Sequence, residues 1–165
     1  MRVLGIDPGT VKMGWGLVDN EGGHVSFWTY GNFSAPRDTV STLLAFLHRR
    51  LTGKVETFHP DVIAIEAGFV GRNQKTALVI GYARAICHLV AGQHGLPIRE
   101  HTPTEVKRGV ASLGKASKES VRLAVAAILG AQETDFTLDE SDALAVAITH
   151  LNATAESNVM ERMYA

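Results

Sequence analysis

The sequence predicts an α/β domain in which a mixed, five-stranded sheet has helices on both faces. The hydrophobic pattern first follows the period of strands over three segments, and then alternates between helical spacing and short apolar runs. That order of elements is typical of a mixed sheet covered by helices on both sides. The 165 residues, 45% of them hydrophobic, suffice for one domain with a substantial core.

The first three strands are expected to form an antiparallel meander. Residues 3–6 are apolar and run into a turn, residues 13–19 alternate apolar side chains with glycine, and residues 24–33 are rich in β-branched and aromatic side chains. Two later segments are candidate short strands, residues 61–66 and residues 97–101. The first of these is almost continuously apolar, as expected of a strand in the middle of the sheet.

Helical spacing begins in residues 40–51 and returns in residues 74–94, where the helix is apolar over much of its circumference. Thr102 with Glu105 predicts a capped helix start, and Ser117 predicts the cap of a helix that ends near Gly130. A last helix is expected from about Asp139 to Asn152. Residues 154–165 are expected to form a flexible C-terminal tail.

Composition narrows the class of protein further. Cys87 is the only cysteine, so an internal disulfide and a thiolate zinc site are excluded, and Cys87 is expected to be buried packing. None of the seven histidines is paired at metal-ligand spacing; His88 and His94 are expected to be structural, and His150 a satisfied core histidine. The sequence has no signal-peptide pattern and no membrane span, which fits a cytoplasmic protein.

The formal net charge of −1 hides an uneven distribution of charged side chains. Residues 67–132 contain nine Lys or Arg and three Asp or Glu, whereas the rest of the chain contains seven basic and fourteen acidic residues. A basic middle beside an acidic remainder suggests a polyanion-binding surface next to an acidic pocket. On charge alone, ordinary solvated helix faces are the better explanation.

Three predicted elements end in carboxylates. Asp7 closes the first strand, Glu66 closes the strand 61–66, and Asp139 and Asp142 share one face at the start of the last helix. Each has an ordinary explanation as a turn residue, a residue just past a strand, or an acid that complements the helix dipole. Glu140 serves that dipole equally well, so capping does not explain carboxylates at both 139 and 142.

If these three ends converge, the carboxylates would repel one another unless a cation lies between them. Ligands that offer only oxygen suit Mg²⁺ or Mn²⁺ rather than zinc. Such a cluster can hold two ions about 4 Å apart, a spacing suited to in-line attack on a phosphodiester. The sequence alone does not bring the three ends together.

Residues 5–10 (GIDPGT), 64–66 (AIE) with Phe69, and 142–150 (DALAVAITH) resemble, in order and separation, the RuvC family of Holliday-junction resolvases. Residues 103–107 (PTEVK) and 114–118 (GKASK) are similar to that family's basic segment. The resemblance extends to about Asn152. It implies a ribonuclease-H-like fold and a nuclease domain spanning residues 1–153.

The resemblance also implies roles for individual residues. Asp7, Glu66, Asp139 and Asp142 would be catalytic ligands of two ions, Mg²⁺ or Mn²⁺, in each active site. One ion would activate the attacking water and the other would stabilise the leaving oxygen, giving nicks with 5′-phosphate and 3′-hydroxyl ends. Lys107 and Lys118 match basic active-site residues of the family and would contact phosphate; without the family they would be solvated helix lysines.

The DNA contacts implied by the resemblance lie in the basic middle of the chain. Phe69 matches an aromatic residue that the family places at the junction centre, where it can stack on an unpaired base; the alternative is a core phenylalanine. The other residues expected to contact DNA are Arg72, Asn73, Lys75, Lys107, Arg108, Lys115 and Lys118.

The implied substrate, four-way junction DNA, has approximate two-fold symmetry, so paired nicks in recombination and repair are expected from a homodimer. The helix 74–94 is the expected interface, and a fully buried intramolecular helix is the alternative. The family further implies the RuvA/RuvB branch-migration complex as a partner. The chain departs from the family at Ser112, where a glycine is frequent, and in its pI of about 6.6, where members are often basic.

Three other functions are compatible with parts of the sequence. ATPases of the actin, Hsp70 and sugar-kinase group also open with a GID-x-GT turn, but they need two such domains. RuvC-like nucleases acting on ribosomal RNA precursors are a nearer alternative, against which Phe69 and residues 142–150 argue. A DNA-binding module with an inactive site would not need four carboxylates.

Overall fold

The computed structural model describes residues 1–36, 38–67, 74–111 and 114–164. Five strands form one sheet in the order β3-β2-β1-β4-β5. β1 (Arg2–Asp7), β2 (Lys12–Glu21) and β3 (His24–Ser34) form the predicted antiparallel meander, while β4 (Val62–Glu66) and β5 (Ile98–His101) run parallel to β1. The predicted mixed five-stranded sheet is therefore confirmed, with β1 at its centre.

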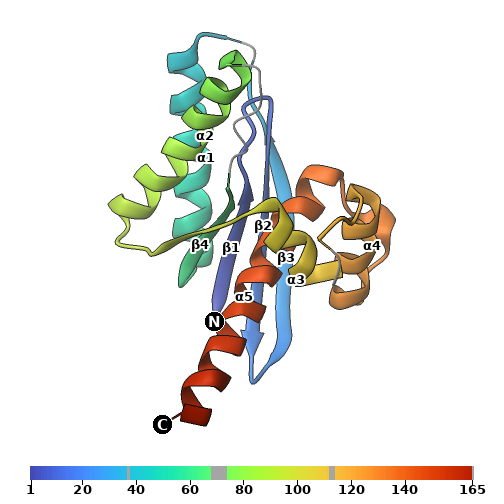
Figure 1. Cartoon of the computed structure of the whole chain (residues 1–165). Coiled ribbons are helices and arrows are strands. Elements are labelled where there is room, and N and C mark those ends of the chain that lie inside the picture. Colours follow the sequence, from blue (N-terminus) through green and yellow to red (C-terminus); the bar gives the residue numbers. More distant parts are fainter. Residues whose placement is uncertain (37, 68–73, 112–113, 165) are drawn as a thin grey trace.

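Helices cover both faces of this sheet (Figure 1). On one face lie α1 (Val40–Phe58) and α2 (Gln74–Gln93). On the other lie α3 (Pro103–Ala111), α4 (Lys118–Leu129) and α5 (Leu138–Tyr164), with α5 against the sheet itself. No helix in the described ranges combines the length and apolar character needed to cross a membrane.

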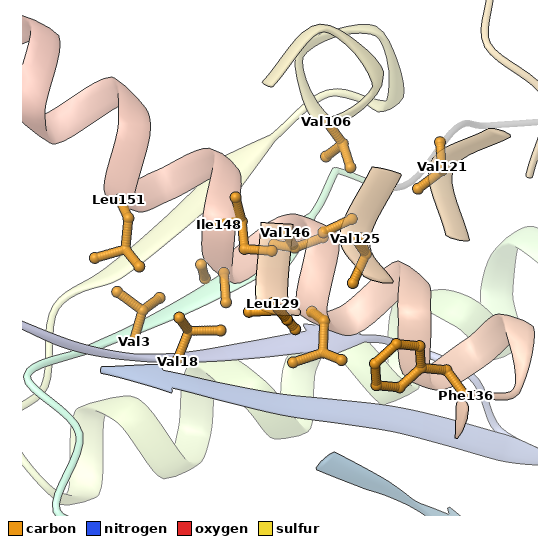
Figure 2. Close-up of a cluster of buried hydrophobic side chains, with 14 of the residues drawn as sticks. Val3, Val18, Val106, Val121, Val125, Leu129, Phe136, Val146, Ile148 and Leu151 are labelled. Atoms are coloured by element: carbon orange, nitrogen blue, oxygen red, sulfur yellow. The ribbon is translucent and has the colours of Figure 1, made fainter. Parts of the chain in front are cut away.

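Alternation along the central strands separates two cores. Leu4 and Ile6 of β1 face α1 and α2, whereas Val3 faces α5. Figure 2 shows the second core, in which Val3 and Val18 of the sheet lie beneath Ile148 and Leu151 of α5. Because side chains of a strand alternate between faces, Gly5 and Asp7 share the α5 face with Val3.

The two predicted caps are present. Thr102 and Glu105 form a reciprocal capping box, with the Thr102 backbone N–H donating to Glu105 at 2.6 Å. The Ser117 hydroxyl accepts from the Ser120 N–H at 3.1 Å. Cys87 is buried as predicted, and this burial raises the pKa of its thiol to about 12.

Two helix boundaries differ from the sequence prediction. α1 continues to Phe58, beyond the helical spacing identified over residues 40–51, and Val55 in this extra length packs into the core. The predicted end of the last helix near Asn152 is wrong, because α5 continues to Tyr164. Apolar periodicity stops where α5 leaves the sheet, but nothing after Asn152 breaks a helix, since residues 153–164 contain neither glycine nor proline. The predicted flexibility of residues 154–165 stays a prediction.

Candidate active site

The four predicted carboxylates come from the same end of the sheet and from the helix that crosses it. β1 and β4 pair in parallel up to Ile6 opposite Ile65, so Asp7 and Glu66 follow as the last residues of two adjacent strands. Both lie on the face covered by α5, because each stands two residues after a residue of that face, Gly5 in β1 and Ala64 in β4. The sheet therefore presents two neighbouring carboxylates to the start of α5.

Glycines in the sheet let α5 lie directly on these strands. Gly14 is the β2 partner of Asp7, and a Cβ at Gly14 would lie 2.0 Å from the backbone oxygen of Asp139. A Cβ at Gly5 would lie 2.1 Å from the backbone oxygen of Ala143. Any other residue would push α5 away, so glycine at these positions brings Asp139 and Asp142 down to Asp7.

The start of α5 has a capping box that the sequence analysis missed, so neither Asp139 nor Asp142 is needed as a helix cap. The Thr137 hydroxyl accepts from the Glu140 N–H at 3.4 Å, and Glu140 in turn accepts from the Thr137 N–H at 2.8 Å. Asn32 of β3 donates to the other oxygen of Glu140 at 2.9 Å. Thr137, three residues before Glu140, was the available signal. Glu140 thus serves the helix start, and Asp139 and Asp142 are not needed there.

The carboxylates are close enough to perturb one another. Burial, followed by the charges of Asp142, Glu66 and Asp139, raises the pKa of Asp7 to about 7, with Lys118 acting in the opposite direction. Burial and the charge of Asp142 also raise the pKa of Glu66. The shifts arise because ionising both groups places like charges together away from water. The pairing of β1 with β4 and the close approach of α5 at Gly14 thus bring the three element ends together.

Two predicted lysines belong to this cluster. The Lys118 ammonium donates to Asp142 at 2.5 Å, and Asp142 is nearly buried. Burial acts to lower the pKa of Lys118, but its hydrogen bond to Asp142 and the nearby charges of Asp7 and Glu66 raise it overall. Lys107 of α3 is half-buried, and its charge acts to lower the pKa of Glu66. Both ammonium groups offset part of the negative charge.

The donor set fits hard divalent cations, because the carboxylates supply oxygen and no histidine or cysteine lies among them. Within the described residues, however, no three acidic, histidine or cysteine side chains are already arranged around a common metal position. The Lys118 ammonium engages Asp142, one of the four carboxylates.

The remaining predicted DNA contacts are not part of the acidic cluster. Arg108 and Lys115 are exposed, and neither contributes to the raised pKa of Asp7 or Glu66. Arg108 instead lines a hollow of about 230 Å³ with His101 and Asn152. Lys75 lies at the start of α2, and its side chain is outside the described part of the structure. Phe69, Arg72 and Asn73 lie outside the described residues.

His150 of α5 and His101 of β5 form a pair near the site. Their Nδ1 and Nε2 atoms are 3.2 Å apart, and both rings are half-buried. Burial lowers the pKa of both imidazoles. His150 thus has a hydrogen-bonding partner, as expected of a satisfied histidine, and the sequence analysis did not identify His101 as that partner.

The fold and the acidic site together define a ribonuclease-H-like nuclease domain. Residues 3–150 match the family model described as "Crossover junction endodeoxyribonuclease RuvC". The chain is 39% identical over 162 residues to the Syntrophomonas wolfei protein of that name, covering 98% of this chain and 94% of that protein. It is also 40% identical over 151 residues to the Moorella thermoacetica protein of that name, covering 91% of this chain and 90% of that protein.

Solved structures agree with the sequence match. Thermus thermophilus RuvC superimposes with a TM-score of 0.81 at 30% identity, covering 95% of this chain and 97% of that one. The same protein in complex with a Holliday junction gives a TM-score of 0.84 at 31% identity, covering 95% and 96%. This chain belongs to the RuvC family of crossover junction endodeoxyribonucleases.

Proposed function

We propose that this protein resolves four-way DNA junctions by cation-dependent hydrolysis of one phosphodiester in each of two symmetric strands. The observation that carries the proposal is the gathering of Asp7, Glu66 and Asp142 around the Lys118 ammonium, each close enough to perturb the others. Family membership supplies the substrate class, because the related Thermus protein is described in complex with a Holliday junction.

Asp7, Glu66, Asp139 and Asp142 would hold the cations. Nucleases of this family generally use divalent metal ions, and two Mg²⁺ or Mn²⁺ ions suit a site built from carboxylates alone. When bound, such ions supply Lewis acidity for the attacking water and the leaving 3′ oxygen, which would leave 5′-phosphate and 3′-hydroxyl ends.

The protein side chains would orient the substrate. The Lys118 side chain is 60% exposed, and its ammonium can exchange the contact with Asp142 for one with a phosphate oxygen. Lys107 flanks Glu66 from α3 and would stabilise negative charge on the same phosphate. Phe69, Arg72, Asn73, Lys75, Arg108 and Lys115 remain proposed DNA contacts on the strength of the family resemblance.

A homodimer would present two such sites to the two-fold symmetric junction. α2 buries one side against the core through Ala83, Cys87 and Val90. Its outward side carries a stripe at helical spacing of exposed Leu78, Gly81, Ala85 and Leu89, with the two leucines 57% and 48% exposed. An exposed apolar stripe of small and large residues suits a second helix of the same kind. We further propose, from the family, that the protein works with a branch-migration complex of RuvA and RuvB. Its action in recombination and repair and its cytoplasmic location are proposed on the same basis.

The decisive experiment compares wild type with Asp7→Asn on a synthetic four-way junction in Mg²⁺ or Mn²⁺. We expect the variant to bind the junction with near-wild-type affinity and to cut it more slowly by about 100-fold or more, since even an outer-shell partner of a metal ligand can be worth that much. Gel-shift and cleavage assays on the same preparations separate binding from chemistry.

The matched control is Glu56→Gln, which makes the same type of change on α1, away from the acidic site. It should bind and cut like wild type. Retained cutting by Asp7→Asn would remove Asp7 from the mechanism. Wild-type binding without cutting would instead indicate a junction-binding module, and preferential cleavage of structured RNA would indicate the RNA-processing alternative.

A further inference from the structure

Glu66 stands at the end of β4, and a contact from the other face of the sheet reaches its backbone. The guanidinium of Arg84, which lies on α2, donates through Nη1 to the backbone oxygen of Glu66 at 2.8 Å. Ala67, the next residue, donates its N–H to the backbone oxygen of His101 at 2.7 Å. The main chain around this candidate ligand is thus held by β5 and by α2.

Arg84 is itself held in place. Its Nη2 donates to Glu100 Oε2 at 2.7 Å, and the second oxygen of Glu100 lies 3.1 Å from His88 Nε2, one turn further along α2. The Arg84 side chain is only 20% exposed. The contact with Arg84 also lowers the pKa of Glu100, so this carboxylate stays ionised and remains paired with the guanidinium.

We infer that Arg84 is a positioning residue for Glu66, which it holds in register for cation binding by bridging the Glu66 carbonyl to Glu100. The inference rests on the proposed cation-binding role of Glu66. Arg84 does not touch the reacting atoms. It fixes the main chain from which the carboxylate projects, as outer-shell partners of metal ligands do.

The geometry explains why arginine is needed. A surface ion pair between Arg84 and Glu100 would by itself contribute little. The guanidinium is planar, and its two terminal nitrogens hold their N–H donors in fixed directions, so it can bind a carbonyl and a carboxylate at once. A lysine ammonium at this position can keep the charge and one of these contacts, but it lacks the rigid fork. Arg84→Lys should therefore be intermediate between wild type and Arg84→Gln.

The test titrates Mn²⁺ against the full chain and follows two quantities, the rate of junction cleavage and the rise in Tm that the cation produces. For Arg84→Gln we expect the half-saturating Mn²⁺ concentration to rise about tenfold or more in both measurements. Arg84→Lys and Glu100→Gln should shift it in the same direction by smaller factors. Arg49→Gln removes an exposed arginine from α1 and should stay within about twofold of wild type.

A structural role alone would lower the Tm of the cation-free protein and leave the Mn²⁺ dependence unchanged. The inference would be overturned if Arg84→Gln showed only this lower Tm and cut junctions as fast as wild type, with the same Mn²⁺ dependence. If Arg84→Gln does not fold, Arg84→Lys decides, and a wild-type Mn²⁺ dependence in that variant has the same consequence. Absence of cation-dependent cleavage in the wild type would instead reject the proposed function.

Discussion

At the scale of residues, the main feature of this protein is the raised pKa of a buried carboxylate, Asp7. Asp7 is buried beside other acids, and its pKa rises to about 7 from the usual 3.8. The neutral form is thus favoured by the fold, and the ionised form is penalised. A bound divalent cation would remove that penalty, because an opposite charge close to a carboxylate favours ionisation.

The raised pKa of Asp7 predicts how the stability of the protein depends on pH in the absence of divalent cations. A carboxyl group whose pKa is raised by folding contributes stability while it is protonated, and that contribution is lost as the pH rises from about 4 through about 7. Asp7→Asn stays neutral throughout. We therefore expect the variant to match wild type near pH 4 and to exceed it at pH 8.5 by on the order of 2–4 kcal/mol.

Urea denaturation in a chelating buffer at both pH values measures the difference. Adding Mn²⁺ at pH 8.5 should reverse the order, because a cation that binds only the folded wild type stabilises it by mass action. Equal stability of the two proteins at pH 8.5 in the chelator would mean that Asp7 is not crowded by its neighbours.

At the scale of elements, α5 carries half of the acidic site, and its position is set by its contacts with the sheet. Its cap, Thr137 with Glu140, fixes where the helix begins. Gly5 and Gly14 set how closely it approaches the sheet. The positions of Asp139 and Asp142 are therefore set by the cap and the two glycines, none of which is proposed to bind a cation or substrate.

Gly14→Ala tests this placement. The added Cβ would meet a backbone oxygen of α5, which has no rotamer to change, so the helix start must shift. We expect a loss of about 1–3 kcal/mol in the free energy of unfolding. Cleavage should fall by about 100-fold, since a displacement near 1 Å at a reacting group can have that effect.

The control for this substitution is Gly53→Ala on α1, where nothing lies within 4 Å of the added Cβ. Alanine is the better helix former there, so the control should gain up to about 1 kcal/mol and cut junctions normally. Urea denaturation and junction cleavage are measured for both variants. Normal cleavage by Gly14→Ala would show that the site tolerates a displaced α5.

At the scale of the whole molecule, the two faces of the sheet support different surfaces. The α5 face carries the acidic site, and the opposite face carries α2 with its exposed apolar stripe. Arg84 links these two faces through the end of β4. In the proposed dimer, the helix that contacts the second copy would thus also support Glu66.

Leu89→Glu should disrupt that dimer. A charge placed at the centre of an apolar contact between two helices would be buried without a partner, so we expect a monomer at micromolar concentration by light scattering. On a junction, the variant should give single, uncoupled nicks. Leu123→Glu makes the same change at a residue of α4 that is 53% exposed, and it should remain dimeric. A dimeric Leu89→Glu would place the interface elsewhere.

Much of this protein is determined by the sequence alone, because it depends on local chemistry. The pattern of apolar residues predicted the first four strands and the main helices, and local side-chain chemistry predicted the caps at Thr102 and Ser117. Asp7 and Glu66 stand out in the sequence because each closes an apolar strand. The end of α5 was not predictable in this way, because nothing after Asn152 breaks a helix, whereas Pro60, two residues beyond Phe58, marks the end of α1 in the sequence.

Tertiary structure decided what depends on segments far apart in the chain. Only parallel pairing of β1 with β4 makes Asp7 and Glu66 neighbours, and only the contact of α5 with Gly5 and Gly14 adds Asp139 and Asp142. The bond from Arg84 to the Glu66 carbonyl has no sequence signal at all, because a backbone oxygen is the same at every residue. Sequence thus determines which side chains are available, and packing of distant segments decides which of them act together.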